Sequence, residues 1–192
     1  GAQTVIRDVL VGRVWLCSGQ SNMDFPLSKA VGGKSEAAAA SGFPAIRLCN
    51  WTGVPTDSRI YQNSELSRLN PNNHFQGTWK TADSAAEISA IAWWAARIVH
   101  EKTKVPIGIV ENAVGGSPME AWLPLETLRS RPDYSELLDP AWLDCPRMSE
   151  WSRSRAKRNL GGHLDGNHPF RPGFLFESGV RPWRSFPFDA VL

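Results

Sequence analysis

The chain has 192 residues, enough for one domain of ordinary size. Lysine and arginine total 21 and aspartate and glutamate total 19, and a net charge of +2 excludes a strongly basic nucleic-acid-binding protein as the default interpretation. Apolar residues make up 42% of the sequence, which is ordinary for a globular protein. The longest apolar run, 90–96, is far shorter than the ~20 residues of a membrane-spanning helix, so no membrane partner is expected.

The first half of the chain contains two predicted strands. Residues 9–18 are β-branched and apolar, which predicts a strand buried on both faces of a parallel sheet. After Gly19 a polar cluster around Ser21 predicts a sharp turn that leads into a helix. A short helix is expected within 29–42, a second strand at 45–49, and a long surface connection over 53–78.

The clearest helix signal begins at Ser84. Ser84 and Glu87 have the spacing of a capping box, and apolar side chains then recur at helical spacing from Ile88 to Val99. Pro106 ends this helix. Residues 107–112 predict a third strand, which leads into a pair of glycines.

A strand, a helix and a strand in this order predict a parallel sheet covered by helices, that is, an α/β fold. Ligands of such sheets bind beyond the carboxyl ends of the strands, so the turns at 19–23 and 113–119 should meet in space. Residues 187–192 resemble the start of another strand. We therefore expect 1–192 to be a single domain that is incomplete at its C-terminus.

Ser21 is the first candidate catalytic residue. A serine that follows a buried strand is exposed at the sheet edge, and its own N–H at a helix N-terminus would help to bind an oxyanion. The surrounding residues do not form a Gly-x-Ser-x-Gly elbow, because Met23 stands at the position of the second glycine. The plain alternative is a serine that only caps a helix.

Gly115 and Gly116 form the second candidate site, together with Ser117. Paired glycines after a strand let the backbone approach a ligand closely, and they can present a second N–H to an oxyanion. The alternative is an ordinary turn.

Asp165 and His168 form the third candidate. An aspartate three residues before a histidine can orient it as a general base, although the segment has the composition of a surface loop. No spacing typical of a metal site occurs. The basic run 153–158 is read as a solvated face, with a phosphate-binding patch as the alternative.

Two blocks of the sequence resemble sialate O-acetylesterases of the SGNH hydrolase superfamily. The first block is residues 8–23, which contain Gly19-Gln20-Ser21-Asn22-Met23. The second runs from Ser89 through 105–110 to 115–124. A looser similarity covers 172–192, the approach to a third block of this family.

The resemblance implies a three-layer α/β/α sandwich with a central parallel sheet, as in flavodoxin-like folds. It implies a carbohydrate O-acetylesterase with Ser21 as nucleophile, Ser21 and Gly116 in the oxyanion hole, and no cofactor or metal. Further substrate-binding candidates around these positions are Gln20, Asn22, Gly115, Ser117, Glu120 and Trp122. Periplasmic or secreted location is expected by analogy alone.

The family's catalytic Asp-x-x-His would lie beyond Leu192. By this alignment Asp165 and His168 are an unrelated match, and a C-terminal continuation or a second chain supplies the histidine. The alternative function is an inactive carbohydrate-binding or scaffold domain of the same fold. In that case Trp51, Trp79 and Trp122 could line a sugar groove.

Overall fold

The computed structural model describes residues 3–138, 141–164 and 166–192. Its strands are β1 (Arg13–Gly19), β2 (Ile46–Asn50), β3 (Trp79–Thr81), β4 (Ile107–Ala113) and β5 (Ala190–Val191). Its α-helices are α1 (Gly33–Ala39), α2 (Asn63–Leu66), α3 (Ala90–Thr103), α4 (Leu125–Arg129) and α5 (Glu150–Leu160). Short 3-10 helices span Leu27–Lys29, Ala40–Gly42, Ala82–Glu87, Met119–Trp122, Pro132–Leu138, Trp142–Asp144 and Arg181–Trp183, and a π-helix spans Phe176–Val180.

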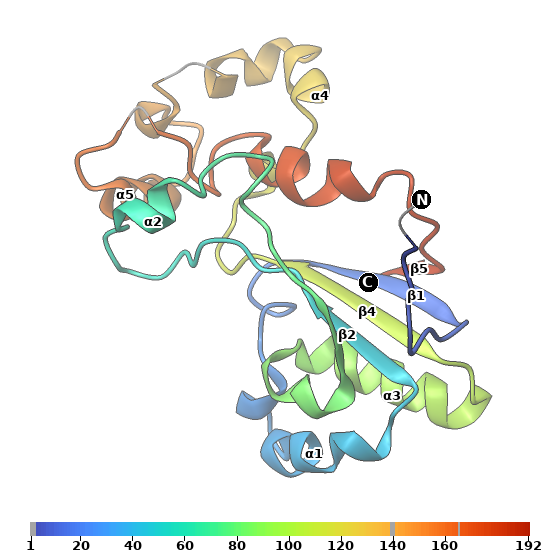
Figure 1. The fold of residues 1–192 in the computed structure, drawn as a ribbon. Coiled ribbons are helices and arrows are strands. Elements are labelled where there is room, and N and C mark those ends of the chain that lie inside the picture. The colour runs from blue at the N-terminus through green and yellow to red at the C-terminus, as the bar shows by residue number, and fades with distance from the viewer. Residues whose placement is uncertain (1–2, 139–140, 165) are drawn as a thin grey trace.

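The strands form one five-stranded sheet in the order β3-β2-β4-β1-β5 (Figure 1). β1 pairs in parallel with β4 and β5, and β2 pairs in parallel with β4. The α/β fold is confirmed, as is a final strand within 187–192. The edge strand β3 runs antiparallel to β2, so the sheet is mixed and not fully parallel.

The first strand is shorter than predicted. Val9 and Val11 are 67% and 92% exposed, and pairing begins only at Arg13. The physical reason is the partner strand, which begins at Ile107, directly after Pro106. Gly12 lies so close to Pro106 that an added Cβ would stand 2.2 Å from the proline carbonyl oxygen.

The long helix also begins later than its sequence signal. Ser84 and Glu87 lie in a 3-10 helix, and the N-cap of α3 is Ser89, whose hydroxyl accepts from the Ala92 N–H. A tertiary contact explains the shift: Glu111 on β4 accepts a hydrogen bond from the Ser89 N–H and so fixes the start of the helix at Ser89. The predicted capping box is therefore wrong.

The buried side of α3 differs from the predicted apolar stripe. Ile91 and Ile98 are both 48% exposed, whereas Ala92, Trp93 and Ala96 are fully buried against the sheet. The side of α3 that packs on the sheet is therefore the one that carries Ala92, Trp93 and Ala96, and it leaves Ile91 and Ile98 partly in solvent. The first core lies here, between the sheet and the helices α1 and α3.

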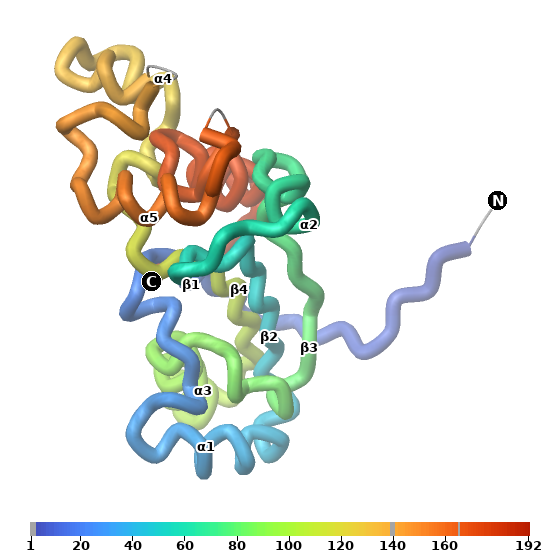
Figure 2. The backbone as a smooth tube through the Cα atoms, turned by 90° about the vertical axis from the view of Figure 1, so that its left-hand side faces the viewer, coloured from blue at the N-terminus to red at the C-terminus, as the bar shows by residue number. Residues whose placement is uncertain are grey.

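A second core lies beyond the carboxyl ends of the strands. Figures 1 and 2 show α2, α4 and α5 grouped there, away from α1 and α3. The connection 53–78, predicted as a surface segment, contributes buried Val54, Tyr61, Leu69 and Phe75 to this core. It packs inward because the segments around Trp142 and Phe170 supply an apolar surface that the sheet does not.

The other face of the sheet is covered in part by the C-terminal segment. Leu16, Cys49 and Val110 form a small cluster against Trp183 and Phe188. Within the described residues, no helix has both the length and the apolar character needed to cross a bilayer.

Trp93 provides a test of the first core. Its indole N–H donates to Glu36 Oε1 at 2.9 Å and its ring meets Phe43 edge-on. We expect Trp93→Phe to lower the free energy of unfolding by about 1–3 kcal/mol, because the hydrogen bond and ring volume are lost. Chemical denaturation measures this, with the half-buried Trp94→Phe as control; equal losses in both variants would contradict the assignment.

Candidate active site

The turns that follow β1 and β4 meet at the carboxyl edge of the sheet, as predicted. Gly19 lies opposite Ala113 in the parallel register, and the Val114 N–H donates to the Gly19 carbonyl at 3.0 Å. Beyond the strands, the Gly115 N–H donates to Asp24 Oδ2 at 3.0 Å. Residues 91 positions apart in the sequence therefore form one continuous edge.

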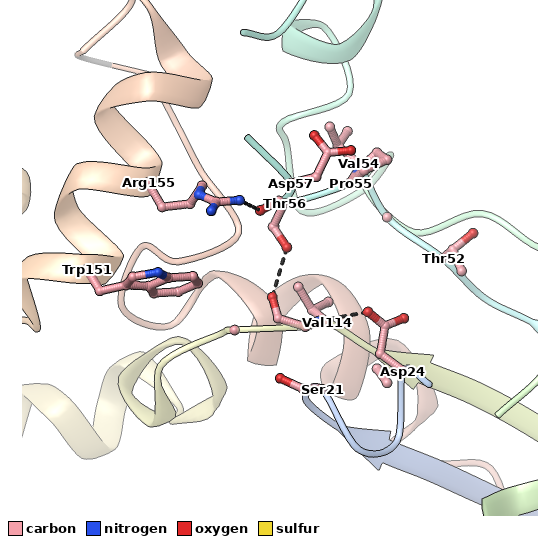
Figure 3. Close-up of a pocket in the computed structure, with 14 residues that line it drawn as sticks. Ser21, Asp24, Thr52, Val54, Pro55, Thr56, Asp57, Val114, Trp151 and Arg155 are labelled. Carbon is pink, nitrogen blue, oxygen red and sulfur yellow. Dashed lines mark hydrogen bonds between the residues drawn. The ribbon is translucent and has the colours of Figure 1, made fainter. Parts of the chain in front are cut away.

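Ser21 is exposed at this edge and lines a cavity of about 460 Å³. The other walls of the cavity are the loop 52–57, the glycine turn after β4, and one side of α5 (Figure 3). The Ser21 hydroxyl donates to Gln20 Oε1 at 2.8 Å, and the Ser21 N–H contacts the same oxygen at 3.3 Å. The hydroxyl is thus accessible, and its partner is an exposed glutamine side chain.

The predicted helix directly after Ser21 is not formed. The chain continues through a turn to a bridge between Pro26 and Ser89, and the first α-helix begins at Gly33. The bridge forms because backbone groups of this segment pair with the start of α3. A helix dipole therefore contributes nothing to the Ser21 N–H.

Gly116 lines the same cavity. Its φ of 73° lies in the left-handed region that favours glycine, and an added Cβ would stand 2.3 Å from the Trp151 ring. Across the described residues its N–H has no hydrogen-bond partner, whereas the Gly115 and Ser117 N–H groups are both used. A serine hydroxyl and a backbone N–H without a described partner, on two residues that line one cavity, are groups that acyl transfer uses.

The remaining predicted binding residues are placed in three different ways. Ser117 is buried inside its turn, where it donates to the Val114 carbonyl and accepts from the Trp122 indole N–H at 2.8 Å. Gln20 and Glu120 line a second, open depression along 146–153. Asn22 is exposed on the turn after β1. The roles of these residues in substrate binding stay predictions.

The tryptophans expected at a sugar groove lie elsewhere. Trp51 packs against Trp183 with ring centroids 4.3 Å apart, and Trp79 lies on the edge strand beside Gly108, at the opposite end of β4. Trp122 is packed against the second core. The cavity wall carries Trp151 instead, which is 51% exposed.

Sequence reasoning missed the loop 52–57 and several other residues of this cavity, among them Asp24, Trp151 and Arg155. Arg155 lies in the basic run and places its guanidinium 5.2 Å from the Trp151 ring centroid. The two residues are four positions apart on α5 and so share one face of the helix. That spacing was the available signal, but only the packing of α5 against the second core brings this face to the cavity.

A hydrogen bond ties Arg155 to the loop on the other side of the cavity wall. Its Nη1 donates to the Thr56 carbonyl at 3.0 Å.

His168 occupies the second core and does not line the cavity. Its side chain is fully buried, its Nδ1 accepts from the Phe170 N–H at 2.9 Å, and its Nε2 lies 3.1 Å from Asn159 Oδ1. Because Nδ1 is the acceptor, Nε2 carries the proton and donates to Asn159. Burial lowers the pKa of His168 to about 3. Asp165 lies outside the described residues.

None of the other histidines lines the cavity. His74 is fully buried in the second core region, against Phe75 and Phe174, and burial lowers its pKa to about 3. His100 lies in the last turn of α3 with Nδ1 2.8 Å from the Val105 carbonyl. His163 is exposed in the loop after α5.

Two carboxyl groups lie close to the site. Glu111, on β4, is 3% exposed and accepts from the Ser89 N–H at 2.7 Å. Burial, and to a smaller extent the negative charge of Asp24, raises the pKa of Glu111 to about 8. Desolvation also raises the pKa of Asp24, while the Gly115 N–H and Lys29 oppose this shift. Glu111 therefore adds little negative charge near the site at neutral pH.

Comparison with known proteins adds a family to this geometry. The family model described as "Carbohydrate esterase, sialic acid-specific acetylesterase" matches residues 11–142. The mouse sialate O-acetylesterase is 27% identical over 129 residues, 65% of this chain and 23% of that protein. The human sialate O-acetylesterase is 27% identical over 121 residues, 61% of this chain and 22% of that protein.

A solved structure agrees with these matches. The crystal structure of a carbohydrate acetylesterase from Xanthomonas citri has a TM-score of 0.60 and 28% sequence identity to the chain, with 97% of this chain and 32% of that chain covered. The chain thus spans about a quarter of the length of the curated relatives and about a third of the solved one.

Glu111 provides a test of the electrostatics. With its pKa raised from 4.5 to about 8, the folded protein binds one more proton than the unfolded chain between these pH values. The free energy of unfolding should therefore fall as the pH rises through this window, by a few times ~1.4 kcal/mol.

We expect Glu111→Gln, whose amide oxygen can still accept from Ser89, to flatten this dependence. Thermal unfolding measured from pH 5 to 8.5 tests it, with the surface variant Glu101→Gln as control. Wild type and Glu111→Gln with the same slope would contradict the expected titration.

Proposed function

Because the chain belongs to the carbohydrate esterase family described as sialic acid-specific acetylesterase, we propose that it removes O-acetyl groups from sugars with Ser21 as the nucleophile. The observation that carries the proposal is the position of the exposed Ser21 hydroxyl, which shares one cavity with the unpaired Gly116 N–H. The names of the relatives, sialate O-acetylesterase and carbohydrate acetylesterase, support an acetylated carbohydrate as the substrate. The 192 residues are taken as part of one SGNH-type domain.

The proposed reaction is an acyl transfer in two steps. The Ser21 oxygen attacks the acetyl carbonyl carbon, a general base takes the hydroxyl proton, and the carbonyl oxygen becomes an oxyanion. The N–H groups of Ser21 and Gly116 donate to that oxyanion, which requires Gln20 to release the Ser21 N–H. Collapse breaks the ester bond, the sugar oxygen leaves with the proton, and water then hydrolyses the acetyl-serine.

The general base is proposed to come from a C-terminal continuation or a second chain. None of the four histidines of the chain lines the cavity, and both ring nitrogens of His168 are engaged in the core. The relatives are about four times longer than the matched segment, which supports a contribution from further residues.

Ser21→Ala tests the nucleophile. In the complete enzyme, with the part that supplies the base, we expect hydrolysis of an aryl acetate to fall ~10³-fold or more, because the attacking oxygen is removed. Covalent labelling by a fluorophosphonate should also be lost. Ser154→Ala, an exposed serine on α5, is the matched control.

Equal hydrolysis by wild type and Ser21→Ala would end the proposal. Sugar affinity without ester turnover in the complete protein would favour the inactive, carbohydrate-binding alternative.

His168→Gln tests the source of the base. Glutamine can still donate to Asn159, and we expect a loss of about 1–3 kcal/mol in stability from the altered core. Fluorophosphonate labelling of Ser21 per folded molecule should stay within about twofold of wild type, since no reacting proton passes through His168. The exposed His163→Gln is the control; a folded His168→Gln enzyme that no longer labels would assign the base to His168.

A further inference from the structure

The peptide that joins Gly115 to Gly116 lies at the centre of a β-turn. The Ser117 N–H donates to the Val114 carbonyl at 3.2 Å and closes the turn, and Gly116 has the positive φ that a type II turn requires at its third position. With glycine at both central positions, this peptide can rotate to the type I orientation without a Cβ clash of its own. The turn by itself therefore does not decide where the Gly116 N–H points.

Thr56 contacts the same peptide from the loop after β2. Its hydroxyl donates to the Gly115 carbonyl at 2.9 Å (Figure 3). The carbonyl and the N–H of a planar trans peptide point in opposite directions, so a carbonyl held by Thr56 directs the Gly116 N–H away from it. The rotated peptide would leave the Thr56 hydroxyl without this acceptor, which disfavours rotation.

Two further hydrogen bonds hold this arrangement. Asp24 accepts from the Gly115 N–H and so fixes the preceding peptide to the turn that carries Ser21. On the other side, the Thr56 carbonyl accepts from Arg155 at 3.0 Å, which ties the loop to α5. Trp151 of the same helix lies against Gly116. A chain of hydrogen bonds thus crosses the cavity from the nucleophile turn to α5.

We propose that Thr56 is a positioning residue that selects the peptide orientation in which the Gly116 N–H serves the oxyanion, with Asp24 holding the neighbouring peptide. The inference rests on the proposed function, because an oxyanion forms only if Ser21 attacks an ester. Thr56 acts through the Gly115 carbonyl and touches no reacting atom. An interaction that matters only in the transition state affects kcat far more than KM.

Thr56→Val removes the hydroxyl and keeps the shape of the side chain. In the complete enzyme we expect kcat for an aryl acetate to fall ~10- to 100-fold, below the ~10²–10³-fold loss typical of a deleted oxyanion donor, with KM changed less than about threefold. Inhibition by phenylboronic acid, which forms a tetrahedral adduct with the serine, should weaken in parallel. Thr56→Ser should restore both values.

Thr78→Val is the matched control, because it makes the same substitution at an exposed threonine outside the cavity, and no described residue hydrogen-bonds the Thr78 hydroxyl. If Thr56→Val unfolds, Thr56→Ala, which removes the same hydroxyl with a smaller side chain, gives the same test against Thr56→Ser.

Fluorophosphonate labelling of the complete wild-type enzyme separates this inference from the proposed function. No label on Ser21 would overturn the proposed function itself. A labelled enzyme in which Thr56→Val has wild-type kcat, or in which Thr56→Ser fails to restore it, would overturn only the role of Thr56. An equal loss in Thr78→Val would overturn it as well.

Discussion

The parallel pairing of β1 with β4 is the constraint on which the site depends. In that register Gly19 lies opposite Ala113, so the two chain segments leave the sheet side by side and in the same direction. An antiparallel pair would have sent them to opposite ends of the sheet. The pairing brings the turn that carries Ser21 beside the glycine turn after β4. The buried contacts of α3 with the sheet stabilise this pairing.

The second core has a different task, because it builds the wall opposite the sheet edge. Trp142, Leu160 and Phe170 anchor α5 there, and α5 carries Trp151 and Arg155 to the cavity. His168 belongs to this anchoring, since its ring bonds Asn159 of the same helix. A histidine with a fully buried ring and two engaged nitrogens supports the position of a helix, whereas a general base needs one nitrogen free to face the nucleophile.

Charge and conformation are balanced around the glycine turn. Burial raises the pKa of Glu111 to about 8, so at neutral pH its carboxyl adds little negative charge beside Asp24. Gly115 and Gly116 allow close approach of Asp24 and Trp151, and the same freedom makes the turn's central peptide rotatable. Side chains from three distant segments then restrict that freedom, so that a flexible turn holds one geometry.

The sequence by itself determined the α/β class, the strands around 13–19, 46–50 and 107–113, and the meeting of their turns, because buried apolar runs and glycine-terminated strands are local signals. It also pointed to Ser21 and Gly116 through their motifs. It could not place the start of α3, the burial of 53–78, or the neighbours Thr56, Trp151 and Arg155. Those depend on contacts between residues far apart in the chain. Glu111 accepts from the N–H of Ser89, the N-cap of α3, and the second core orients α5. Only the tertiary structure decides such contacts, since they arise from packing surfaces that no local pattern encodes.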